Sequence, residues 1–380
     1  MDKSKTFWVD AGVAGGLVLA LLLVIGLDKL VSGPAPKSAN VIITTNEPPK
    51  TSQEARPLRL AVTPTEEDEN GKWDDMNKLL NSLGKGYHFD VYPIRELRDG
   101  KKLAGYDVLF LTCGKGEPER TFTSNIRDFV GKGGTLYASD WRYEWVAKAF
   151  PEFYARNLVG RGKARRQLKA DVLDQGLRDI LGATVTLNFN LSKWKTAAFA
   201  GDKVKVLIEA EYDKEEVDGG GSATAPLLVK FPFQAGNVIF TSFHNERQNS
   251  DVETKLLKYL VFSAVTAKTE AHVTQTMIKG GFSPQKSNLL SASSDSSTIE
   301  QIYQSKKGGK IRFVLGFEDR GATMTLSVFG PDGSELAKKT GTSTISIDVN
   351  NAQPGNYSYT VSARVPYPDF PFTLTVGESE

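Results

Sequence analysis

Hydrophobic and polar positions follow an alternating strand and helix pattern over residues 58–265. Short apolar runs, such as LRLAV at 58–62 and YDVLFLTC at 106–113, are separated by segments with helical spacing. This alternation predicts an α/β fold, with a mostly parallel, doubly wound sheet covered by helices on both faces. The predicted strands are 58–62, 88–94, 106–113, 135–139, 204–210, 225–231 and 237–243, and the predicted helices are 74–83, 124–134, 141–154, 173–181 and 250–265.

From residue 310 onward the pattern changes to short strands separated by turns. Gly-Pro-Asp-Gly at 330–333 and Gln-Pro-Gly-Asn at 353–356 are typical turn sequences. We therefore expect a C-terminal antiparallel β-sandwich at 306–380. Its predicted strands are 310–317, 323–329, 344–349, 357–364 and 372–376, and the Ser-, Thr-, Lys- and Gln-rich segment 268–305 is predicted to be a linker with a short helix or strand.

The N-terminal segment has the pattern of a membrane anchor. Residues 11–27 form an uninterrupted apolar run, and the flanking residues extend it to 7–31, just long enough to span a bilayer core. Lys3 and Lys5 favour a cytoplasmic N-terminus, which would place the body of the chain outside the cytoplasm. The alternative is a cleaved signal peptide, for which the apolar core is long. We therefore expect a single-pass anchor at 1–31.

The anchor segment contains a possible helix-pairing motif, and a tether follows it in the chain. Gly12 and Gly16 form a GxxxG pattern, which lets two helices approach closely and suggests a homodimer, although so many small residues make the pattern common by chance. Residues 32–56 are rich in Pro, Ser and Thr and are predicted to be an extended tether.

Composition excludes several functional classes. The 380 residues include 47 Lys and Arg and 45 Asp and Glu, a net charge of +2, whereas nucleic-acid binders usually carry a large basic excess. With one cysteine, three histidines and none of the common metal or phosphate motifs, the chain is predicted to have no cofactor and no metal site.

The order of motifs in the middle region resembles that of a known family. YDVLFLTCGKG, then a helix, GGTLYASD, and AGNVIFTSFHNE before a last helix are similar to class I glutamine amidotransferase-like domains, especially their trehalose-utilisation-type branch. The resemblance covers residues 57–267. It implies an amidotransferase-like version of the doubly wound sheet.

The same resemblance implies a set of catalytic positions. The turn 137–141 matches the family's Gly-x-Cys-x-Gly turn, so Ser139 occupies the nucleophile position, although both glycines are absent. Residues 243–246, Phe-His-Asn-Glu, resemble the family's Phe-His-Pro-Glu, so His244 is implied as the general base and Glu246 as its orienting group. Ser139, His244 and Glu246 would then form a serine hydrolase arrangement.

We favour a site without catalysis. The missing glycines put the turn geometry in doubt, and the charge of Asp140 would crowd a serine nucleophile. Cys113 ends an earlier strand, and we interpret it as a small buried residue.

Ligands of α/β sheets bind at the carboxyl ends of the strands, which here include 112–116, 139–142 and 244–248. A basic cluster at 161–169 is a second candidate surface for acidic partners, although such a run is more often a solvated loop and helix face. The candidate binding residues are Asp140, Trp141, Arg142, Arg161, Lys163, Arg165 and Arg166.

The C-terminal strands carry a looser resemblance. The run 353–361 and the final FTLTV strand are similar to bacterial pre-peptidase C-terminal domains, which implies a binding or spacing module.

Three functional hypotheses follow. The first is a non-catalytic, membrane-anchored binding or scaffolding protein in a bacterial complex with other membrane-associated proteins. The second is a membrane-anchored serine hydrolase, and the third is a carbohydrate-binding protein, favoured by the aromatic residues at 141–145.

Overall fold

The computed structural model describes residues 40–42, 59–68, 71–82, 88–163, 166–248, 250–292, 297–317, 321–367 and 370–379. The predicted anchor at 1–31, its Gly12 and Gly16 pair, and most of the predicted tether lie outside the described residues. Within the described ranges, no helix is both long and apolar enough to cross a membrane.

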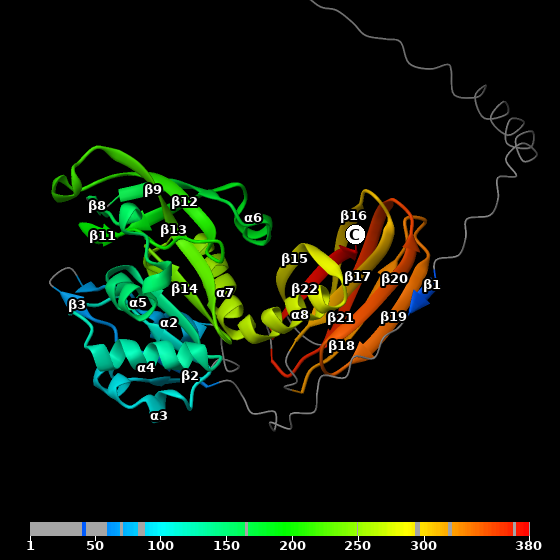
Figure 1. The fold of residues 1–380 in the computed structure, drawn as a ribbon, viewed down its shortest axis with the longest axis horizontal. Helices are drawn as coiled ribbons and strands as arrows, with labels where there is room; N and C mark the ends of the chain where they lie inside the picture. Colours follow the sequence, from blue (N-terminus) through cyan, green and yellow to red (C-terminus); the bar gives the residue numbers. More distant parts are fainter. Residues whose placement is uncertain are drawn as a thin grey trace, which may run out of the picture. The chain divides into compact units, whose positions relative to one another are not determined.

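A nine-stranded sheet forms the centre of the α/β domain, and half of it is parallel (Figure 1). Four neighbouring pairs are parallel and four are antiparallel, so the prediction of a mostly parallel sheet was wrong for one half. The parallel strands, in sheet order, are β14 (Gly236–Thr241), β7 (Thr135–Ser139), β6 (Val108–Leu111), β2 (Leu60–Val62) and β5 (Phe89–Val91). The antiparallel strands are β10 (Thr184–Phe189), β9 (Arg166–Val172), β12 (Lys205–Asp213) and β13 (Ser222–Phe233).

A short connection explains why β13 and β14 are antiparallel. Phe233 pairs with Gly236 across a tight hairpin, in which Gln234 adopts a positive φ of 49°. A hairpin of this length joins only antiparallel strands, because parallel neighbours need a long crossover. The sequence pattern also missed β9 and β10, together with a separate small sheet of β8 (Arg161–Lys163) and β11 (Lys193–Lys195).

Helices cover both faces of the parallel half. On one face, α4 (Arg120–Gly131) and α5 (Tyr143–Ala149) bury residues such as Ile126 and Val146 against the sheet. On the other, α2 (Met76–Ser82) and α7 (Ser250–Val265) contribute residues such as Leu80 and Leu260. The α/β domain also contains the helices α3 (Gly100–Leu103) and α6 (Gln175–Leu181) and the two-residue strands β3 (Glu67–Asp68) and β4 (Gly71–Lys72). Its 3-10 turns are η1 (Ile94–Arg98), η2 (Asp140–Arg142), η3 (Pro151–Phe153), η4 (Arg156–Leu158), η5 (Glu216–Asp218) and η6 (Asn245–Arg247).

The predicted helices are present, with changed ends. The helix expected at 250–265 is confirmed as α7, whereas α4 begins at Arg120, earlier than predicted. The helix predicted at 141–154 is interrupted, because α5 ends at Ala149 and Pro151 begins η3. Proline lacks the backbone N–H that would continue the helix.

The C-terminal region is an antiparallel sandwich, as predicted. One sheet orders β1 (Asn40–Ile42), β20 (Ile345–Ala352), β17 (Gly309–Gly316), β22 (Phe370–Ser379) and β15 (Phe282–Ala292). The other orders β16 (Ser297–Ser305), β21 (Gly355–Arg364), β18 (Thr323–Phe329) and β19 (Glu335–Gly341).

The segment predicted as a linker at 268–305 is instead regular structure. It contains most of α8 (Ala267–Lys279), and it contains β15 and β16, which pair with β22 and β21. Val273 and Met277 of α8 pack against Phe282 and Val314. The polar composition misled the prediction because these strands expose many of their side chains.

Candidate functional site

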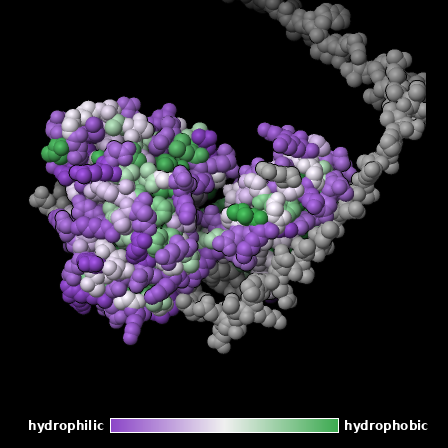
Figure 2. Space-filling model, viewed as in Figure 1, coloured by the Kyte–Doolittle hydropathy of each residue, from purple (hydrophilic) through white to green (hydrophobic). Residues whose placement is uncertain are grey.

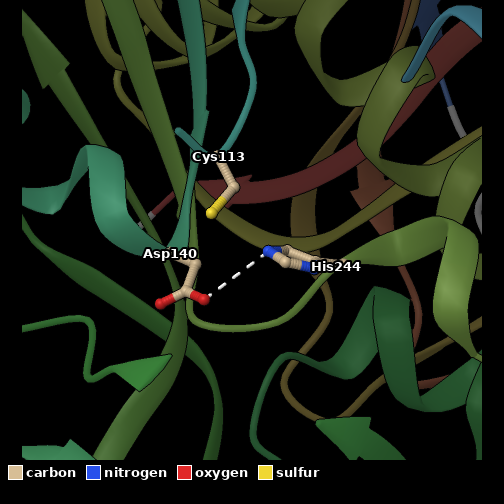
Figure 3. Close-up of side chains that lie close together, drawn as sticks. All are labelled: Cys113, Asp140 and His244. Carbon is tan, nitrogen blue, oxygen red and sulfur yellow. Dashed lines mark ion pairs between the residues drawn. The ribbon is translucent and has the colours of Figure 1, made fainter. Parts of the chain in front are cut away.

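The candidate site lies where three neighbouring parallel strands end. Cys113 follows β6, Asp140 follows β7 directly, and His244 follows β14, and these strands are adjacent in the sheet. Because parallel strands end at one edge, the three side chains meet there although they are far apart in the sequence (Figure 3). Each of them is at most 1% exposed.

Ser139 is engaged by a partner other than His244. Its Oγ donates a hydrogen bond to Asp74 Oδ2 at 2.5 Å and accepts one from the Cys113 backbone N–H at 2.9 Å. Neither ring nitrogen of His244 has a hydrogen-bond partner among the described residues. The serine–histidine pair that the resemblance implied is therefore not formed.

The strained position of the turn is Asp140 rather than Ser139. Asp140 has a positive φ of 44°, whereas Ser139 is extended, with φ −130° and ψ 143°. Asp is one of the few residues that tolerate a positive φ. The positive φ thus lies one residue after Ser139, the residue that the resemblance implied as the nucleophile. Asp140 Oδ1 accepts a hydrogen bond from the Lys195 backbone N–H at 2.7 Å, and its Oδ2 lies 3.5 Å from His244 Nε2.

Burial controls the protonation of this cluster. It raises the pKa of Asp74 to about 7, although the hydrogen bond from Ser139 acts in the opposite direction. Burial also raises the pKa of Asp140 well above its usual range. The pKa of His244 falls to about 3, because burial and the nearby charge of Arg247 both disfavour the imidazolium. A general base works best with a pKa near the working pH, so His244 is poorly suited to that role.

Glu246 does not orient His244. Its carboxylate forms ion pairs with Arg247, at 2.6 Å, and with Lys78, at 3.5 Å. The sequence motif therefore places Glu246 near His244 along the chain without connecting their side chains.

Arg142 was predicted to lie on a binding surface, but it is a buried structural residue. Its guanidinium donates to the backbone oxygens of Thr112 and Lys115, both at 3.0 Å, and to Glu66 Oε1 at 2.7 Å. Gly114 permits this arrangement, since a Cβ there would lie 2.1 Å from Arg142 Nη2. Asp140 is also buried, so neither residue is available to a surface partner.

Two cations of the basic cluster form ion pairs within the protein. The cluster forms β8 and β9 instead of the predicted loop and helix face. Lys163 pairs with Glu216 at 3.1 Å, and Arg166 pairs with Asp213. Arg161 is half-buried, and Arg165 lies outside the described residues. This acidic pairing reduces the charge that the cluster offers to another molecule.

An open cavity lies beside the buried cluster. It has a volume of about 460 Å³, and Trp141 on its wall is half-buried. The Trp141 Nε1 donates to the Lys193 backbone oxygen at 3.1 Å, which fixes the orientation of the indole. The lining residues come from several strand ends and loops and are Trp73, Gly114, Lys115, Gly116, Glu117, Trp141, Glu144, Leu191, Ser192 and Lys193.

The buried cluster at the strand ends consists of Asp74, Cys113, Ser139, Asp140 and His244. The sequence did not predict two of its members. Cys113 was interpreted as a small core residue, and Asp74 as the beginning of a helix. Cys113 did carry a usable signal, because it follows a buried strand just as Asp140 and His244 do. The contact of Asp74 with Ser139 has no local pattern in the sequence.

No family model matches this chain, and no curated protein matches it. Solved structures similar to it include a ThuA-like protein from Bacteroides uniformis, which is 14% identical, with a TM-score of 0.41, over 58% of this chain and 96% of that one. A ThuA-like protein from Parabacteroides merdae is 12% identical, with a TM-score of 0.38, over 57% and 91%. The CTPS glutaminase domain of Trypanosoma brucei is 11% identical, with a TM-score of 0.37, over 56% and 94%. The resemblance of the C-terminal strands to pre-peptidase domains stays a prediction.

Proposed function

We propose that this chain is a non-catalytic, membrane-anchored binding component of a bacterial membrane-associated complex. In this proposal, the cavity beside Trp141 accepts an apolar side chain of a partner protein. The observation that carries it is the contrast between the buried Ser139, Asp140 and His244 and the open cavity next to them. Residues 7–31 would supply the anchor, with the body outside the cytoplasm.

The buried cluster supports a function without serine hydrolysis. A serine nucleophile needs a base within hydrogen-bond reach and access to substrate. Ser139 is 0% exposed, and it donates to Asp74 instead of His244. These contacts hold the strand ends together and leave no free hydroxyl.

The cavity is suited to an uncharged group. Its walls include the indole of Trp141, the side chain of Leu191 and exposed glycine backbone. Two of its charged residues already have partners outside the cavity lining, since Glu117 pairs with Lys148 at 2.7 Å and Lys193 with Glu215 at 3.3 Å. Apolar anchors in such pockets supply much of the affinity of protein interfaces.

We expect fluorophosphonate probes to leave the full chain unlabelled at pH 7. The Ser139 hydroxyl is buried, and its proton is engaged by Asp74. Labelling is measured by mass spectrometry, with a known serine hydrolase in the same sample as the positive control. Labelling that disappears in both Ser139→Ala and His244→Ala would establish the hydrolase alternative instead.

We expect the cavity to cross-link to a partner in membranes. A photoreactive amino acid replaces Glu144, a half-buried lining residue, in the full chain. The matched control replaces Lys132, which is exposed at the opposite, amino-terminal edge of β7. Trp141→Ala is expected to lower the yield at position 144 severalfold, because truncating an aromatic hot spot costs about 2 kcal/mol of binding free energy.

Two results of this experiment would overturn the proposal. One is an equal yield at positions 144 and 132, and the other is a yield at position 144 that Trp141→Ala leaves unchanged. If no protein cross-links at 144 and oligosaccharides quench tryptophan fluorescence of the parent but not of Trp141→Ala, the carbohydrate alternative replaces it. That alternative is favoured by the flat indole and the Glu144 carboxylate, which suit the apolar face and the hydroxyls of a sugar.

The surface of the described residues supports the choice of this cavity. The face shown in Figure 2 is mostly hydrophilic, with hydrophobic side chains in small separate groups. The large exposed hydrophobic residues of the described ranges come from different parts of the chain and are Val91, Tyr154, Leu173, Val217, Ile278 and Ile302. Single exposed apolar residues of this kind are normal on soluble surfaces.

A further inference from the structure

Three potential metal ligands converge at the carboxyl edge of the sheet. Cys113, Asp140 and His244 each offer one ligand atom, and these atoms all lie within 4.8 Å of one another. Figure 3 shows the three side chains close together, with a dashed line between Asp140 and His244. They come from the ends of three adjacent strands, so the sheet itself sets their spacing.

The distance between the ligand atoms of His244 and Asp140 is similar to the distance between two ligand atoms of a zinc site. Ligand atoms around a tetrahedral zinc ion are about 3.5 Å apart, given the usual zinc–ligand bond lengths. His244 Nε2 and Asp140 Oδ2 are 3.5 Å apart. A direct hydrogen bond between nitrogen and oxygen would be about 2.7–3.2 Å long. The pair is thus too far apart for a hydrogen bond and correctly spaced to share an ion.

The buried imidazole needs a partner. His244 is 1% exposed, and both of its ring nitrogens lack a hydrogen-bond partner among the described residues. Buried polar groups are almost always paired in folded proteins, and an ion bound at Nε2, the nitrogen that faces Asp140, would supply the partner of that nitrogen.

The Asp140 ligand is already oriented. The Lys195 backbone N–H binds Asp140 Oδ1, which leaves Oδ2 facing His244. Outer hydrogen bonds of this kind typically hold metal ligands in position. The positive φ of Asp140 is a further sign, because backbone strain gathers at functional sites.

We propose that Cys113, Asp140 and His244 bind one zinc ion. A thiolate, a carboxylate and a neutral imidazole around Zn²⁺ carry no net charge, so a closed site can hold them without a buried excess charge. The sulfur ligand selects against magnesium and calcium, which take oxygen ligands. A non-protein ligand such as water fills the fourth position of the tetrahedron.

This site goes beyond the proposed binding function and does not depend on it. The zinc ion joins the ends of β6, β7 and β14, next to the cavity but separate from its lining residues. The sequence predicted no metal because its ligands are scattered along the chain and match no local spacing motif.

The single cysteine makes the proposal sharply testable. The full chain is purified in a mild detergent from cells grown with zinc, and bound metal is measured by mass spectrometry. We expect about one zinc ion per chain. A second sample is refolded with Co²⁺, which takes the place of zinc. Because Cys113 is the only cysteine, a thiolate-to-cobalt charge-transfer band in the ultraviolet spectrum can come only from this site.

Variants separate this site from other metal binding. Cys113→Ser and His244→Gln are expected to lower zinc affinity at least tenfold, since losing even an outer partner of a ligand costs about 10–100-fold. His272→Gln, at an exposed histidine of α8, is the matched control and is expected to retain zinc.

Each contrary outcome overturns the proposal. A folded parent protein that holds no zinc and shows no cobalt–thiolate band has no such site. Zinc that remains in Cys113→Ser, or binding without a thiolate band, places the metal elsewhere. If Cys113→Ser does not fold, the band of the parent protein still decides. The cross-linking result at position 144 is independent of each of these outcomes.

Discussion

Replacing Arg142 by methionine is expected to lower the free energy of unfolding by about 3–5 kcal/mol, because each buried acceptor that loses its donor costs about 1–3 kcal/mol. The side chain of Arg142 is 1% exposed, and removing its guanidinium takes the ion-pair partner from Glu66, which is 33% exposed and keeps its hydrogen bond from the Lys115 backbone N–H. The backbone oxygens of Thr112 and Lys115 lose their donors as well. Methionine has a similar length, so the change tests the charge and the hydrogen bonds more than the volume. Urea unfolding followed by circular dichroism measures the difference.

A surface ion pair provides the control for Arg142. Lys148 pairs with Glu117 at 2.7 Å, but the two side chains are 49% and 79% exposed. Lys148→Met is therefore expected to change the free energy of unfolding much less than Arg142→Met does. Equal effects of the two substitutions would contradict the assignment of Arg142 as the buried connection between the loop after β6 and the loop after β7.

Replacing Trp194 by alanine is expected to cost about 3–5 kcal/mol of unfolding free energy, through lost burial and the cavity that remains. Trp194 is 1% exposed. The centroid of its ring lies 4.0 Å from the ring centroid of Phe189 and 5.2 Å from that of Tyr212. Trp194 packs so closely on Gly162 that a Cβ there would lie 1.9 Å from the indole. The same unfolding experiment measures the loss.

Trp141→Ala is the matched control, because it removes an indole that is half-buried instead of buried. Its expected cost is roughly 1–2 kcal/mol, in the ordinary range for a single substitution. A loss at Trp194 no larger than that at Trp141 would mean that the small β8–β11 sheet contributes little to the core.

The hydrophobic pattern of the sequence predicted an element correctly where that element buries one clearly apolar face or run of its own. The apolar run at 135–139 became the fully buried strand β7, and the helical spacing at 250–265 became α7. The alternating segment at 323–329 became β18. In each case the period of the apolar residues matches the element, and the core covers the apolar face.

The hydrophobic pattern did not predict polar strands whose structure depends on pairing with another strand. Strands β9 and β10 are half polar, and each is ordered by pairing with the other. Strand β16 lies in the segment predicted as a linker. It is ordered by pairing with β21, a strand much later in the chain. Cross-strand partners stabilise such segments, and no local window of sequence contains them.

The amino-acid sequence by itself determined the alternating strands and helices of the parallel half of the α/β domain, the antiparallel sandwich, and the edge of the sheet at which Ser139, Asp140 and His244 lie. Only the tertiary structure decided what these residues contact. It paired Ser139 with Asp74, moved the strained turn position to Asp140, buried Arg142, and brought Cys113 beside His244. The physical reason is that hydrophobic periodicity reports burial within one element, whereas side-chain contacts depend on which strand ends become neighbours.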